Sequence, residues 1–136
     1  MALNRVYAAK LPAISRPVPA GTKSGDALMV NGRPVVALTD REGTVKTETF
    51  GDLTITYPGS TSSNPEGNAS LYIDGTFDLP VTGANASTAN DVPVYYKADK
   101  LTLTGTEGTD DVFGYTNYPP ENYARKAGIA PVRIGA

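Results

Sequence analysis

The amino-acid sequence predicts a mainly β protein: a small compact β-barrel or sandwich with an extended N-terminal arm and at most one short C-terminal helix. Three observations lead to this fold class. The 136 residues include 14 glycines and 11 prolines, which favours turns and short strands over long helices. Short runs that alternate between apolar and polar residues recur along the chain, separated by turn-forming pairs. Prolines also interrupt the first 23 residues, which lack the pattern of a packed element.

Residues 1–23 are predicted to form the arm, and residues 24–136 the β-rich domain. Pro12, Pro17 and Pro19 push the residues before them toward extended backbone. Apolar side chains alternate with basic ones along this stretch, and such a segment is suited to lie across another surface. The alternative is an arm that folds back on its own domain. The predicted contact residues are Leu3, Val6, Leu11 and Ile14.

One hairpin and two further strands are expected in the first half of the domain. Asn31-Gly32 lies between two apolar runs, and both residue types tolerate the positive φ angles of a tight turn. Pro34 places the second strand at a sheet edge, or starts that strand just after it. Residues 44–50 and 53–57 are two further strands, and residues 58–68 form a polar loop.

The second half begins with a strand over residues 69–79, with a bend at Asp74-Gly75 and an end at Pro80. The strands expected after it span 92–97, 101–104, 112–115 and 131–134. Residues 121–127 form one helical turn before Gly128. The core is expected to contain Leu71, Ile73, Phe77, Leu79, Val94 and Leu103.

The residue types exclude several kinds of chemistry. The chain has no Cys and no His, so disulfides, thiol nucleophiles, imidazole catalysis and Cys/His metal sites are absent. Glu107, Asp110 and Asp111 lie close together, but beside glycines, where acidic residues are commonly solvated turn formers. We expect no enzymatic activity, no metal and no cofactor.

Charge is unevenly distributed, although the net charge is only −2. Residues 1–33 carry five bases and one acid, whereas residues 34–120 carry four bases and twelve acids. Basic ends can steer the chain toward an acidic surface; alternatively, the acids only keep the domain soluble. The bases are too thinly spread, without aromatic platforms, to indicate nucleic-acid binding. No apolar run approaches the roughly 18 residues of a membrane span, so no membrane partner is expected.

Tyrosine is the most frequent aromatic residue, with eight of the eleven aromatic positions. Its large apolar ring and polar tip suit interfaces between subunits. The alternative is that these rings cover the core at strand ends. The interface candidates near the C-terminus are Tyr115, Tyr118 and Tyr123.

Five stretches, in this order, resemble the tailed-phage capsid decoration (cement) protein family, formerly of unknown function and sometimes mislabelled as a recombinase. They are Gly25–Val30, Pro34–Thr39, Asp74–Pro80, Asn90–Tyr96 and Val112–Thr116. The resemblance covers roughly residues 20–116 and depends on the order and spacing of the stretches.

The chain departs from the family pattern at three places. Thr76 stands where the family tends to have Val, and Asn90-Asp91 stands where it has a glycine. Residues 40–68 are longer than the pattern expects. Nothing in these residues supports the recombinase label, because no nucleotide-binding motif is present.

The resemblance implies a structural virion protein that sits on the outer surface of the capsid and stabilises the major capsid protein lattice. Its expected partners are the major capsid protein and itself, as a homotrimer with the three tyrosines as interface candidates. Its expected location is the virion, after a period in the host cytoplasm before assembly. The alternatives are another phage structural protein (head fibre base, tail or adaptor) and a carbohydrate-binding β module.

Overall fold

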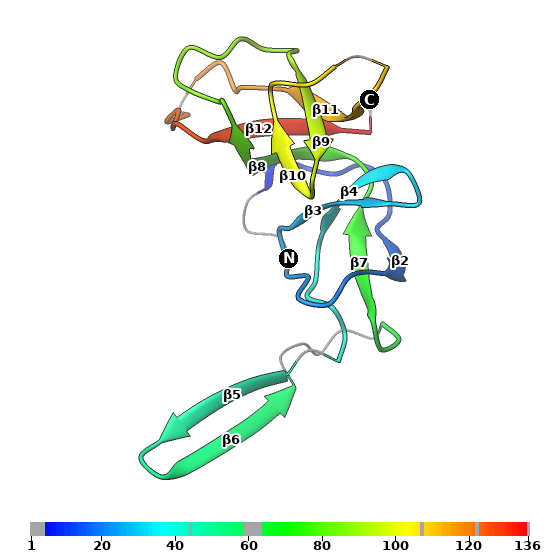
Figure 1. Cartoon of the computed structure of the whole chain (residues 1–136), viewed down its shortest axis with the longest axis vertical. Helices are drawn as coiled ribbons and strands as arrows, with labels where there is room; N and C mark the ends of the chain where they lie inside the picture. Colours follow the sequence, from blue (N-terminus) through cyan, green and yellow to red (C-terminus); the bar gives the residue numbers. More distant parts are fainter. Residues whose placement is uncertain (1–4, 44, 59–63, 107, 122, 136) are drawn as a thin grey trace.

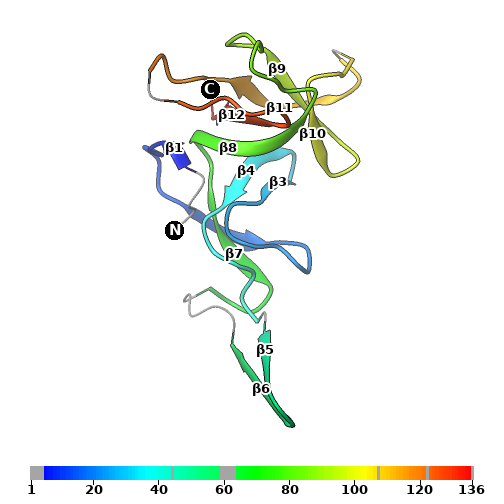
Figure 2. The same cartoon turned by 90° about the vertical axis from the view of Figure 1, so that its left-hand side faces the viewer.

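A computed structural model describes residues 5–43, 45–58, 64–106, 108–121 and 123–135, and confirms the mainly β fold. These residues form two packed bodies and one projecting hairpin (Figures 1 and 2). The strands are β1 Arg5–Tyr7, β2 Ile14–Pro17, β3 Ala27–Val30, β4 Arg33–Ala37, β5 Val45–Phe50, β6 Leu53–Pro58, β7 Asn68–Tyr72, β8 Gly75–Thr82, β9 Pro93–Lys97, β10 Lys100–Thr102, β11 Asp111–Thr116 and β12 Ile129–Ile134.

The larger body is a closed five-stranded barrel. Its strands follow the order β8-β10-β9-β11-β12, and the ring closes because β8 pairs with both β10 and β12. Phe77 of β8 is opposite Val132 of β12, and both side chains are fully buried. Four of the six predicted core residues are buried, whereas Ile73 and Leu103 are half-buried. The buried four are Leu71, Phe77, Leu79 and Val94.

The smaller body is a curved four-stranded sheet in the order β2-β7-β4-β3. Successive strand residues point to opposite faces, so β4 contributes to two cores. Val36 packs into the barrel core, whereas its neighbours Val35 and Ala37 pack into a second, smaller core. This smaller core also contains Val18 and Leu71. The four-stranded sheet therefore has a core on each of its faces, one of them the barrel core, and the two bodies pack as a single unit.

The predicted strand over residues 69–79 is two strands in different sheets, with the bend where the sequence places it. Gly75, with φ of 108°, begins the second strand. The prediction that Pro80 ends this strand is wrong, because β8 continues to Thr82. Val81 N donates to Gly128 O, so the preceding pair, Pro80 and Ile129, is not hydrogen-bonded and needs no donor from proline.

The Asn31-Gly32 hairpin is confirmed, with φ angles of 52° and 75° in its turn. Pro34 lies inside β4, which is an internal strand rather than an edge. Proline is tolerated there because Met29 and Pro34 form a non-hydrogen-bonded pair. On the other side of β4, pairing with β7 starts only at Val36.

The prediction of a helical turn over residues 121–127 is wrong for its described residues, 121 and 123–127. Tyr123 donates a hydrogen bond to Asp78 of the barrel, and the Arg125 guanidinium donates to the carbonyl oxygens of Ala86 and Thr88. A single helical turn is marginal on its own, so these barrel contacts decide the backbone path.

The N-terminal segment lies against both bodies. β1 pairs with β8 of the barrel, and β2 pairs with β7 of the smaller sheet. Between the two strands, the Asp74 carboxylate accepts hydrogen bonds from the backbone N–H groups of Lys10 and Leu11, at 2.8 and 3.2 Å. Residues 5–17 therefore lie against their own domain, which is the second of the two arrangements that the sequence allows for the arm.

β5 and β6 form a hairpin that projects from the smaller sheet, away from the barrel (Figures 1 and 2). The predicted strands at 44–50 and 53–57 correspond to it, with residue 44 outside the described residues. Phe50 and Leu53 pair across the Gly51-Asp52 turn. Gly51 has φ of 63°, as expected for glycine at the first position of a type II′ turn.

Candidate functional site

The described residues contain no group of three or more His, Cys, Asp or Glu that could hold a metal ion. Of the acidic cluster singled out in the sequence, Glu107 lies outside the described residues. Asp110 accepts a hydrogen bond from Thr106 N and forms a 3.6 Å ion pair with Lys97, so it serves the turn. Within the same described ranges, no helix is long and apolar enough to cross a membrane.

The predicted contact residues of the N-terminal segment lie in different environments. Leu3 lies outside the described residues, and Val6 is half-buried in β1. Ile14 packs against the smaller core, and so stabilises the fold itself. Leu11 is 51% exposed, and the structure adds Tyr7, 42% exposed, which is not among the predicted contact residues.

Three basic residues lie on the same chain segment as these two exposed apolar side chains. Arg5, Lys10 and Arg16 are all exposed along the same segment. We define the N-terminal surface as Arg5, Tyr7, Lys10, Leu11 and Arg16. Strand pairing holds the backbone of this surface against the barrel through β1 and against the smaller sheet through β2.

The three tyrosines proposed for a trimer interface also differ in how exposed they are. Tyr118 is only 3% exposed, with its ring 5.8 Å from that of Tyr123 in an edge-on arrangement. The Arg125 guanidinium lies 4.0 Å above the Tyr118 ring, a cation–π contact. Tyr118 is therefore used inside the chain, and of the three rings Tyr115, 41% exposed, is the one most open to a partner.

Tyr123 links the C-terminal stretch to the barrel. Burial raises the pKa of its phenol above the ordinary value, and the hydrogen bond to the Asp78 carboxylate raises this pKa further. The phenol therefore stays protonated and keeps donating at physiological pH. This role is structural, and no short-range sequence signal pairs residue 123 with residue 78.

The β5–β6 hairpin has two unlike faces. The strand register places the Phe50–Leu53 and Glu48–Ile55 pairs on one face. The opposite face carries threonines, in the pairs Thr47–Thr56 and Thr49–Thr54. Phe50 and Leu53 are each 59% exposed, and Ile55 is exposed as well. We define the hairpin apolar face as Phe50, Leu53 and Ile55.

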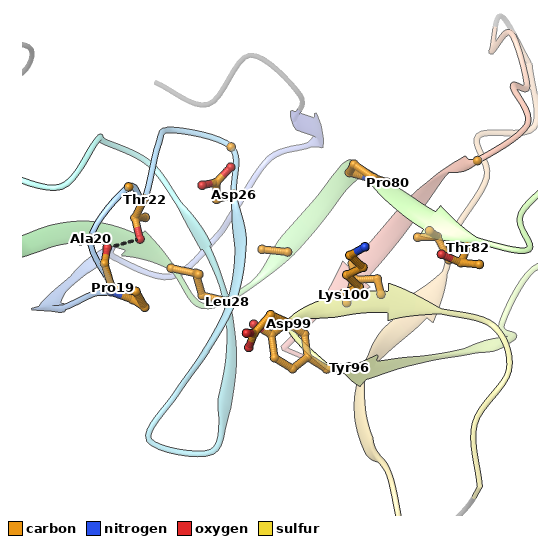
Figure 3. A pocket seen from close by; sticks show the side chains of 16 residues that line it. Pro19, Ala20, Thr22, Asp26, Leu28, Pro80, Thr82, Tyr96, Asp99 and Lys100 are labelled. Atoms are coloured by element: carbon orange, nitrogen blue, oxygen red, sulfur yellow. Dashed lines mark hydrogen bonds between the residues drawn. The ribbon is translucent and has the colours of Figure 1, made fainter. Parts of the chain in front are cut away.

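A cleft of about 750 Å³ lies between β3 and the barrel (Figure 3). Ala27 and Leu28 both line it. Their side chains point to opposite faces of the sheet, so the cleft runs along the outer edge of β3. We call it the edge cleft. Its lining residues come from 19–22, 25–28, 80–82, 99–101, Tyr96 and Gly128.

The edge cleft contains few charged groups. Asp26 accepts a hydrogen bond from Lys23 N. Burial and the nearby Asp99 carboxylate raise the pKa of the Tyr96 phenol. Lys100 also lines the cleft. Because chain segments far apart in the sequence build this cleft, no local motif could have indicated it.

No protein-family model, curated protein or solved structure matches this chain. The functional argument therefore depends on the N-terminal surface, the hairpin apolar face and the edge cleft.

Proposed function

We propose that this chain is a capsid decoration protein that binds the outer surface of a phage head as a trimer and stabilises the lattice of the major capsid protein. The observation that carries the proposal is the N-terminal surface. It presents Tyr7 and Leu11 among three basic residues on backbone that pairs with both bodies. In the sequence, the resemblance to decoration proteins supports the same role.

The backbone of this segment offers a second means of attachment. Among the described residues, β1 pairs only with β8, and β2 only with β7, so each strand has an open edge. An open edge is a template for strand addition by a partner. A coat-protein segment that pairs there gains main-chain hydrogen bonds in addition to the side-chain contacts.

Apolar burial, rather than charge, is expected to dominate this attachment. Exposed ion pairs contribute roughly 0–1 kcal/mol each, and the Debye length of about 8 Å at physiological salt weakens them further. Complete burial of a leucine contributes about 1.5–3 kcal/mol, so covering the exposed half of Leu11 contributes roughly half as much. Salt does not screen this contribution, and three copies multiply it.

The test uses heads of the phage that encodes this chain, freed of their decoration protein. Wild-type protein should bind in near-molar NaCl, and Tyr7→Ser with Leu11→Ser should remove most of the bound protein. Val112→Ser, at an exposed apolar position on the barrel, is the matched control and should bind normally. Co-sedimentation measures occupancy, and cryo-EM locates the protein on the particle.

Three outcomes would contradict the proposal or its physical basis. Release by salt alone, with the double serine variant still bound, would make the contact electrostatic. Density on the tail or at a fibre base instead of the shell would assign another virion role. Binding to glycans by a monomer, without affinity for heads, would identify a carbohydrate-binding module.

A further inference from the structure

The hairpin apolar face and the edge cleft are complementary features at different places on the chain. We propose that the β5–β6 hairpin of one copy inserts into the edge cleft of a neighbouring copy, so that the chains associate head to tail into a closed ring. This inference concerns self-association and does not depend on capsid binding.

The hairpin requires a partner on physical grounds. A two-stranded sheet is marginally stable in water unless another element covers its apolar face. Among the described residues, β5 and β6 pair only with each other, and both outer strand edges are open. Phe50 and Leu53, the most exposed large hydrophobic residues described, lie at the tip, where they would enter a partner first.

The edge cleft offers open main-chain groups. Ala37 N donates to Asp26 O, which places the hydrogen-bonded pairs of the β3–β4 ladder at Asp26 and Leu28. The N–H and C=O groups of Ala27 and Met29 therefore point away from β4. β3 is the last strand of its sheet, so these groups can pair with an incoming strand.

The cleft and the hairpin tip also agree in size and polarity. A hairpin tip with two residues per strand occupies on the order of 700 Å³, given the strand and sheet spacings of β structure. The cleft volume is about 750 Å³. Pro19, Leu28 and Pro80 line it without being fully buried, and these side chains match the apolar surface of Phe50 and Leu53.

Charge complementarity favours a second copy as the occupant. Lys100 forms no ion pair within the described part of the chain, and Asp26, which also lines the cleft, already accepts a hydrogen bond from Lys23 N. Its ammonium group points toward the cleft (Figure 3). Asp52 is at the exposed hairpin tip, between Phe50 and Leu53. Insertion of the tip brings this carboxylate to Lys100.

The position of the hairpin makes the contact intermolecular. It projects from the end of the smaller sheet that lies away from the barrel, whereas the cleft adjoins the barrel (Figures 1 and 3). A hairpin therefore reaches the cleft of a neighbour and leaves its own cleft for a third copy. Such head-to-tail contacts form a ring when the rotation closes. A ring of three agrees with the expected trimer.

The first test measures mass by analytical ultracentrifugation of the full chain without heads. Wild-type protein should form a closed oligomer, whereas Phe50→Ser with Leu53→Ser should be a monomer. Thr49→Ser with Thr54→Ser, on the opposite face of the same hairpin, is the matched control and should assemble. A monomeric wild-type protein at high micromolar concentration would overturn the proposal.

The second test identifies the cleft as the partner. Asp52→Lys and Lys100→Asp should each weaken assembly about tenfold or more, and the two changes combined should restore it. Mixing the hairpin double serine variant with Lys100→Asp should give no assembly beyond dimers, because only one productive contact remains. If hairpin variants block assembly but cleft variants and the charge exchange have no effect, hairpins pack on each other and the proposal fails. Thermal unfolding midpoints that are unchanged at a concentration where the protein is monomeric would show that each variant still folds.

Discussion

The strongest prediction for the fold concerns Phe77, because one side chain connects several strands of the barrel. It is fully buried, and its ring is 5.3 Å from that of Tyr72, at the end of the smaller sheet. At Phe77 itself, β8 pairs with β1 on one side and with β12 on the other. Phe77→Ala therefore removes core volume where the barrel and the smaller sheet meet.

The expected cost follows from this complete burial. Phe→Ala in a well-packed core costs about 3–5 kcal/mol, including the cavity left behind. Loss of the ring contact with Tyr72 adds about 0.5–1.5 kcal/mol. Since small domains are stable by only about 5–15 kcal/mol, this one change should remove a large share of the free energy of unfolding.

Urea unfolding followed by tyrosine fluorescence or circular dichroism measures this free energy. Phe50→Ala is a matched control, because the same substitution at the exposed hairpin position removes a ring that packs little within the chain. Both variants are measured at a concentration where the protein is monomeric, because assembly alters apparent stability. An unchanged midpoint for Phe77→Ala, or an equal loss in both variants, would refute the assigned strand register and core.

Two further predictions concern the barrel. Because the folded-state pKa of Tyr123 is raised, the stabilising effect of its phenol is fully present below the unfolded-state pKa of about 10 and declines as pH rises above that value. The difference in unfolding free energy between wild type and Tyr123→Phe should therefore shrink above about pH 10. A difference that stays constant across this range would contradict the prediction. A Cβ at Gly114 would lie 2.4 Å from the backbone oxygen of Arg133, so Gly114→Ala should destabilise the β11–β12 pairing by about 1–3 kcal/mol or more. Gly108→Ala is the control, because a Cβ there meets open space and the change tests only the effect of positive φ. That effect should cost about 1–2 kcal/mol. An equal or smaller loss for Gly114→Ala would show that the close approach to Arg133 can relax.

Local turn chemistry accounts for most of what the sequence predicts correctly. Two short hairpins turn at residues with positive φ angles, namely Asn31-Gly32 and Ala98-Asp99. The residues at each turn and their immediate neighbours are sufficient to determine it. Local reasoning gives the wrong result at Pro80, where it predicts the end of a strand. Whether a proline ends a strand depends on whether its missing N–H would have paired with a neighbouring strand. For Pro80 this is set by the register with β12, a pairing between residues about 50 positions apart.

The exposed apolar surfaces are only partly predictable from the sequence. The apolar and basic composition of the N-terminal segment indicated a contact surface, and Leu11 is exposed as expected. Ile14 and Tyr118 looked equally suitable in the sequence, but long-range packing places the first against the smaller core and the second inside the barrel core. Exposure depends on what covers a side chain, and in a β protein the covering strand is distant in sequence.

The location of the exposed apolar residues separates two tasks. The N-terminal surface includes Tyr7 and Leu11, whereas Phe50, Leu53 and Ile55 lie on the projecting hairpin. A decoration protein that used one surface for both the shell and its neighbours would have to break one contact to make the other. In the proposed ring, three copies of the N-terminal surface come together before any of them meets the proposed shell. The second and third contacts would then be intramolecular, so a modest apolar contact per copy would be sufficient for firm attachment to a head.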